Sequence, residues 1–122
     1  MAVEFVPVAP RKALLVQGYA PEGYRVAGSV HAGGILIAPE AVHPWAATDL
    51  ESIDPGDFTP LLGAQVLLLG TGQAMRRPPA DLLAALAAQG FAVDFMDSRA
   101  AARTYNVLVV EGRSVAAALL PL

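Results

Sequence analysis

The spacing of apolar and polar residues changes along the chain. In the first third, short apolar runs at residues 13–17, 24–30 and 33–38 are separated by glycines and short connections. Runs of this length with glycine between them are typical of antiparallel strands joined by turns. The second half alternates strand-like and helix-like patterns, which is typical of β-α-β units. The pattern therefore predicts an α/β fold in which an antiparallel meander precedes a β-α-β-α-β segment.

Two strands and the helix between them are the clearest elements of the second half. Residues 66–69 are continuously apolar, as expected of a strand buried on both faces, and residues 91–96 predict the next strand. Residues 79–89 predict a helix, because Asp81 suits the positive N-terminal end and Gly90 suits a left-handed position after the last turn.

A second helix is predicted over residues 98–104. Residues 107–110 and 115–120 then flank a turn, and we interpret them as a closing hairpin, with a final helix as the alternative for the last segment. We expect the last strand to lie at an edge of the sheet. It would complete the core there or, because exposed edges invite pairing, bind a partner.

Residues 39–60 hold four prolines and no apolar run of strand length, so they predict a long ordered connection. Thr48 and Glu51 have the spacing of a capping box, which predicts a short helical turn over residues 49–53. A second turn is expected over residues 57–62. The aromatic and aliphatic side chains expected to pin this connection to the body are Trp45, Ile53 and Phe58.

Two of the predicted strands are followed by residues that bind anions in other proteins. The run Gly70-Thr71-Gly72 follows the first strand, where glycine amides can form an anion-binding nest, and a tight turn is the alternative. Asp97 and Ser98 open the second helix, where their oxygens suit the N-cap. Because open α/β sheets bind ligands at the carboxyl ends of their strands, the two loops predict one crevice.

Arginines accompany both loops. Arg76 follows the glycine loop, whereas Arg99 and Arg103 are four positions apart on the second helix and therefore share a face. Like charges at this spacing repel, so Arg99 needs either a carboxylate partner or an anionic ligand. The carboxylates that could form an internal ion-pair network are Asp94, Asp97 and Glu111.

Tyr105 and Asn106 stand where the second helix is expected to end. They either cap it, with Asn106 in the left-handed conformation, or Tyr105 packs on the core and presents its hydroxyl to the crevice. The residues predicted to line this ligand-binding crevice are Gly70, Thr71, Gly72, Arg76, Asp97, Ser98, Arg99, Arg103 and Tyr105.

The composition of the chain argues against several classes of function. The net charge is −3 and no basic run exceeds two residues, so nucleic acid is not expected as a partner. The chain has no cysteine, and His31 and His43 lie in separate turn-like segments, so we expect no metal site and no base beside Ser98. We therefore predict no catalytic residue and no cofactor.

The 122 residues suit a single domain. The first ten residues contain Glu4 and two prolines and lack the basic and apolar regions of a leader. No apolar run approaches the roughly 20 residues that span a bilayer. We expect a cytoplasmic protein without membrane insertion.

With these motifs in place, the chain resembles the conserved domain of unknown function that includes mitochondrial complex I assembly factor 3. The resemblance covers nearly the full chain and depends most on the run Ala102-Arg103-Thr104-Tyr105-Asn106. Two departures are Ser98, where threonine is usual, and Ala102, where cysteine is common; the second excludes a thiol-dependent role. The other motifs that carry it are Leu69-Gly70-Thr71-Gly72, Arg77-Pro78-Pro79, residues 96–101 and Glu111-Gly112-Arg113.

The resemblance implies one three-layer domain of residues 1–122 around a mixed sheet. For the mitochondrial members it implies a non-catalytic role in the assembly of respiratory complex I through protein partners. The main hypothesis is therefore an accessory factor that acts by protein contact. The alternative is a small-anion or nucleotide-binding module, or an enzyme, that uses the crevice between the 70–77 loop and the 97–105 helix. A third hypothesis is a scaffold that oligomerises through the closing hairpin.

Overall fold

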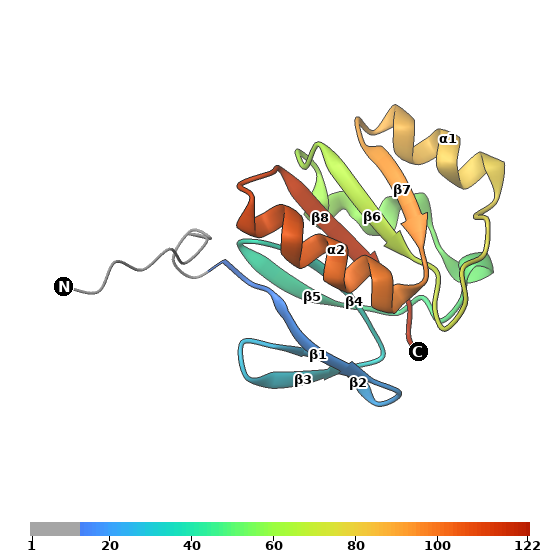
Figure 1. The fold of residues 1–122 in the computed structure, drawn as a ribbon. Helices are drawn as coiled ribbons and strands as arrows, with labels where there is room; N and C mark the ends of the chain where they lie inside the picture. The colour runs from blue at the N-terminus through green and yellow to red at the C-terminus, as the bar shows by residue number, and fades with distance from the viewer. Residues whose placement is uncertain (1–12) are drawn as a thin grey trace.

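The computed structural model describes residues 13–122 as two β-sheets with helices packed against the larger one (Figure 1). The smaller sheet is antiparallel, in the order β1-β2-β3, and the larger sheet is mixed, in the order β5-β4-β8-β6-β7. The predicted α/β fold, with antiparallel strands first and β-α-β-α-β afterwards, is confirmed. The strands are β1 (Val16–Ala20), β2 (Gly23–Val26), β3 (Ser29–Ala32), β4 (Gly34–Ala38), β5 (Ala41–Trp45), β6 (Val66–Gly70), β7 (Ala92–Met96) and β8 (Val115–Leu119).

The helices cover opposite faces of the larger sheet. The helix α1 (Ala80–Ala88) connects β6 to β7, and α2 (Ser98–Val110) connects β7 back to β8, so the two crossovers run in opposite directions. Right-handed crossovers that run in opposite directions place their helices on opposite faces. The short 3₁₀ helices η1 (Leu50–Ser52) and η2 (Pro55–Leu61) share the face of α1, and the smaller sheet shares the face of α2.

Alternating residues of the buried strands form two cores. Leu67 and Leu69 of β6 pack toward α1, Phe58 and Phe91, whereas Leu68 packs toward α2. Strand β8 repeats this alternation with small side chains: Ala116 and Ala118 face one core and Ala117 the other. The larger sheet therefore forms the middle of three layers, as the resemblance implied.

The closing hairpin is the main error of the sequence prediction. Residues 107–110 continue α2 to Val110, so no strand precedes β8 there. Tyr105 and Val109 are buried one helical turn apart, and this packing outweighs the strand preference of the valines. Strand β8 then lies between β4 and β6 with every residue buried. The predictions that an exposed final strand binds a partner or forms an oligomer contact are therefore also wrong.

Three smaller corrections concern the first half. The predicted strand over residues 24–30 is interrupted by a turn at Ala27 and Gly28, whose φ angles of 50° and 81° suit a two-residue hairpin. The predicted connection over residues 39–60 is shorter than expected, because residues 41–45 form β5, an edge strand that tolerates Pro44. The capping box of η1 pairs Asp49 with Ser52 rather than Thr48 with Glu51.

The predicted helix at residues 79–89 is confirmed as α1, and Gly90 has a φ of 99° after it. The connection from β5 to β6 is held to the body as predicted. Trp45 donates its indole N–H to the Asp57 carboxylate at 3.0 Å, and its ring meets Phe58 edge-on at 5.7 Å.

Candidate functional site

The loop after β6 and the start of α2 meet at the carboxyl ends of two neighbouring strands. The connections that follow these two strands leave on opposite faces of the sheet. Open α/β sheets bind ligands between strand ends of this kind. Here three hydrogen bonds of 2.8 Å close the gap: Thr71 N–H to the Met96 carbonyl, Ser98 N–H to the Gly72 carbonyl, and Gly72 N–H to Ser98 Oγ. The structure thus brings the two predicted loops together and joins them.

The Ser98 hydroxyl connects three strand ends. It is fully buried, accepts from the Gly72 amide and donates to the Leu120 carbonyl at 2.9 Å. The Tyr24 hydroxyl of β2 donates to the same carbonyl at 2.5 Å, and burial raises the pKa of Tyr24. No imidazole, amine or carboxylate is among these partners of Ser98, so it lacks the adjacent base that a serine nucleophile needs. Its geometry is that of a structural link.

Gly70 allows this close approach. A Cβ atom at this position would lie 2.8 Å from Ser98 Oγ, 2.9 Å from Ser98 Cα and 2.9 Å from Leu119 Cδ2. Any larger residue would push α2 away from the sheet. The first glycine of the loop therefore serves packing between β6 and α2.

The polar groups predicted to form an anion nest have partners within the protein. Thr71 Oγ1 donates to the Ala74 carbonyl at 2.7 Å and accepts from the Arg76 amide at 3.1 Å, which folds the loop around the threonine. Asp97 caps α2, and its Oδ1 accepts from the Ala100 amide at 3.0 Å. An anion that took the place of these partners would have to displace these hydrogen bonds.

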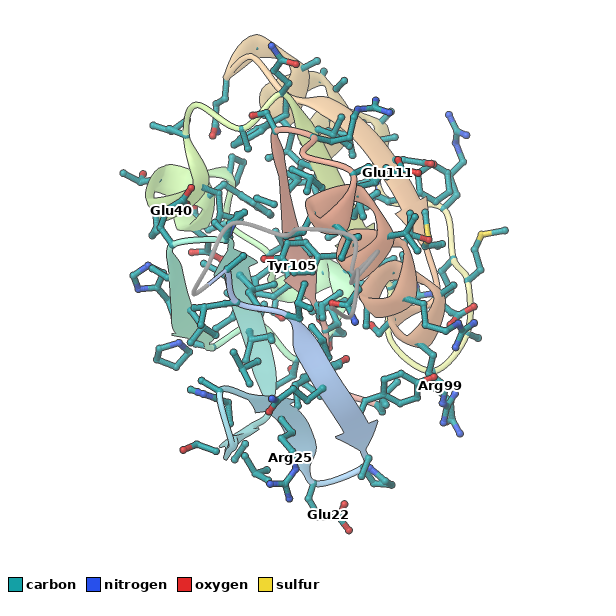
Figure 2. All side chains as sticks on the ribbon, turned by 60° about the vertical axis from the view of Figure 1, so that its left-hand side comes forward. Glu22, Arg25, Glu40, Arg99, Tyr105 and Glu111 are labelled. Atoms are coloured by element: carbon teal, nitrogen blue, oxygen red, sulfur yellow. The ribbon has the colours of Figure 1, made fainter. Side chains whose placement is uncertain are left out.

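The arginines do not form the expected ion-pair network. Arg76 binds Glu51 at 2.6 Å on the surface, and this hydrogen bond lowers the pKa of the Glu51 carboxyl. Within residues 13–122 this is the sole ion pair, so Asp94, Asp97 and Glu111 do not neutralise Arg99 or Arg103. Arg103 instead donates to the Tyr19 hydroxyl at 2.7 Å. Figure 2 shows Glu111 at the opposite end of α2 from Arg99.

Tyr105 and Asn106 lie inside α2 rather than at its end, so the predicted cap is wrong. The buried Tyr105 hydroxyl donates to the Leu14 carbonyl at 2.8 Å, away from the crevice. Asn106 accepts from the Val16 N–H and donates to the Val16 carbonyl, each at 2.8 Å, as a neighbouring strand would. Burial and the negative charge of Glu40 raise the pKa of Tyr105.

The motif of residues 103–106 therefore attaches β1 to α2, since Arg103, Tyr105 and Asn106 all bond to residues 14–19. Sequence reasoning missed this role, although an asparagine on the buried side of a helical pattern could have suggested it. It also missed Tyr24, whose contact with Leu120 joins residues far apart in the chain.

Other features of the surface lie away from the crevice. One hollow of about 380 Å³ is lined by residues 38–40, 60–64 and 112–115 with Val109, and another of about 390 Å³ lies on the smaller sheet between Gly18 and Val30. Among residues 13–122, no cluster of three or more histidine or carboxylate side chains could hold a metal ion. No helix in this part of the chain has the length and apolarity needed to cross a membrane.

Comparison with known proteins gives a family and several relatives. A family model described as "Protein of unknown function (DUF498/DUF598)" matches residues 16–120. An uncharacterized protein of Rhodobacter capsulatus is 42% identical over 94% of this chain and 94% of its own length. The zebrafish protein named NADH dehydrogenase (ubiquinone) 1 alpha subcomplex assembly factor 3 is 34% identical over 88% of this chain, which spans only 64% of that protein.

Solved structures show the same fold. A Bordetella pertussis protein described as a Mth938-like domain has a TM-score of 0.80 at 28% identity, covering 99% of this chain and 92% of its own. A Bartonella henselae protein described as an outer membrane protein has a TM-score of 0.80 at 32% identity, covering 89% of this chain and 95% of its own.

Proposed function

This chain belongs to the DUF498/DUF598 family, and from that membership we propose that it acts through protein partners, as an accessory or assembly factor of respiratory complex I. The observation that carries the proposal is the similarity to the zebrafish assembly factor along 88% of the chain. This chain spans 64% of that protein, and we propose that the assembly role belongs to the shared domain.

The geometry of the crevice supports a role without catalysis. The Ser98 hydroxyl, the Gly72 amide and the Asp97 carboxylate all serve hydrogen bonds inside the protein. A pocket that binds a substrate normally presents a few polar groups that are free to converge on it. Here those groups hold β6, α2 and the segment after β8 together, which suits a rigid domain that presents its outer surface to a partner.

The test is genetic complementation. The gene is deleted in the organism that encodes it, and complex I is followed on native gels by its NADH dehydrogenase activity. We expect less assembled complex and an accumulation of subcomplexes, both reversed by the intact chain. Normal assembly after deletion would disprove the proposal.

A Ser98→Ala variant separates the two main hypotheses in the same strain. It removes the fully buried Ser98 hydroxyl from the crevice and leaves the outer surface of α2 unchanged. We expect it to restore assembly wherever its cellular level matches that of the unmodified chain. Loss of function at an equal level would favour a chemical role for the crevice instead.

We propose a cytoplasmic location for this chain. The similar Bartonella henselae protein is described as an outer membrane protein, and fractionation decides between the two locations for this chain. Fractionation of cells that carry a tagged chain should recover it in the cytoplasmic fraction. Recovery from membranes after a high-salt wash would contradict this placement.

A further inference from the structure

The outward side of α2 carries a ridge of four residues spaced by four positions: Arg99, Arg103, Val107 and Glu111. Residues at this spacing are neighbours along the surface of a helix. Arg103 and Glu111 are exposed, Arg99 is half-buried, and Val107 keeps 54% of its surface exposed. We call these four residues the α2 ridge.

The two arginines of the ridge carry positive charge that no carboxylate within residues 13–122 neutralises, because the sole ion pair there is Arg76 with Glu51. Arg99 also lies in the first turn of α2, next to the positive end of the helix dipole. The two charges are one turn apart and repel each other. A negatively charged partner would relieve both effects.

Tyr19 of β1 fixes the position of one of these charges. Its hydroxyl accepts a 2.7 Å hydrogen bond from Arg103 Nη1, which orients the guanidinium without neutralising it. A guanidinium that is already oriented loses less conformational freedom when it pairs with a carboxylate. The next residue of the ridge, Val107, is apolar and exposed, so the ridge changes from positive to apolar within one turn.

We propose that the α2 ridge is the docking surface for an acidic segment of the protein partner, with two carboxylates on Arg99 and Arg103 and an apolar side chain on Val107. This inference rests on the proposed function and names the chemistry of the partner. The charges are complementary, because the two guanidinium groups at the N-terminal end of α2 match the carboxylates of such a segment. Glu111, at the far end of the ridge, disfavours a segment that is acidic along its whole length.

The first experiment compares two charge reversals in the complementation strain. Arg103→Glu changes the ridge, and Arg113→Glu makes the same change of charge at an exposed residue after α2. Both chains are first checked for equal cellular level and for equal thermal unfolding. We expect Arg103→Glu to lose complex I assembly and Arg113→Glu to keep it. If both variants restored complex I assembly equally, the α2 ridge would not be the docking surface, and the proposed assembly role would still stand.

The second experiment does not depend on assembly. The isotope-labelled chain is titrated with a synthetic helical peptide that carries two glutamates and a leucine at four-residue spacing, and with a control peptide that has glutamines instead. We expect saturable amide shifts at the α2 ridge, about threefold to tenfold weaker binding by Arg103→Glu, and weaker binding at high salt. Equal binding of both peptides, or no saturable shift, would overturn the proposal.

The two experiments separate the possible failures. If the deletion leaves complex I intact, the proposed function fails, and the peptide titration alone decides whether the ridge binds acidic segments. A third measurement adds vesicles of anionic phospholipid to the same chains. Vesicle binding that depends on Arg99 and Arg103, without binding of the acidic peptide, would assign the ridge to a membrane surface and overturn the protein-docking proposal.

Discussion

The inward and outward sides of α2 both carry polar residues, but these residues have different surroundings. On the inward side, Ser98, Tyr105 and Asn106 give their polar atoms to hydrogen bonds with other segments of the chain. On the outward side, Arg99 and Arg103 hold charges that no carboxylate of residues 13–122 neutralises. Polar residues at the end of a strand are therefore not by themselves evidence of a ligand site. What distinguishes the two sides is that the inward polar groups are satisfied by other segments of the chain, whereas the outward charges are not neutralised, since Arg103 bonds to the neutral hydroxyl of Tyr19.

The packing of the inward side of α2 is most sensitive to substitution at Gly70 of β6. Gly70→Ala should destabilise the protein by about 1–3 kcal/mol, because the new methyl group would overlap Ser98 and Leu119. Gly18→Ala is the matched control, since nothing lies within 4 Å of its added Cβ, and it should change stability by less than about 0.5 kcal/mol. Urea unfolding of both variants provides the measurement. Equal effects would mean that the contact between β6 and α2 is not tight.

Asn106 tests the attachment of β1 to the helix. Asn106→Ala should cost about 2 kcal/mol, because the N–H and carbonyl of the buried Val16 both lose their partner. Val107→Ala, at the next position on the outward side, should change stability by less than about 0.5 kcal/mol. Hydrogen exchange should show faster exchange of the Val16 amide in the first variant alone. Unchanged exchange there would refute the strand-like role of the side chain.

Alkaline pH should lower the free energy of unfolding through two buried tyrosines. Burial raises the pKa of Tyr24 and Tyr105 in the folded state, so each favours folding while it is protonated. This contribution is complete below the unfolded pKa near 10 and is lost as pH rises above it, by up to about 1.4 kcal/mol per pH unit for each tyrosine. Tyr105→Phe should therefore reduce the slope of unfolding free energy against pH above about 10. An unchanged slope would show that Tyr105 does not contribute to it.

The smallest effect is expected from inorganic phosphate. The Gly72 and Ser98 amides already donate to protein atoms, so a phosphate titration should leave their chemical shifts unchanged. Weak shifts confined to Arg99 and Arg103 are compatible with an exposed positive surface. Saturable shifts at Gly72 and Ser98 would show instead that the crevice opens, and the anion-binding alternative would then replace the structural interpretation.

Part of the site was predictable from local pattern. The sequence placed Gly70 and Ser98 at the ends of neighbouring strands, and the structure brings their loops into contact. Asp97 at the N-cap followed from its position before the helix. The partners of Ser98 and Asn106 could not be predicted, because Leu120 and Val16 are distant in sequence and come close only when β8 and β1 pack on α2.

The sequence by itself determined the α/β class, the helix α1 and the turn at Gly90, because these depend on residues within a few positions of one another. The tertiary structure decided that α2 extends to Val110 and that β8 lies in the middle of the sheet. The valine-rich segment 107–110 favours a strand by local preference. Burial of Tyr105 and Val109 against β1 and the larger sheet supplies the free energy that selects the helix.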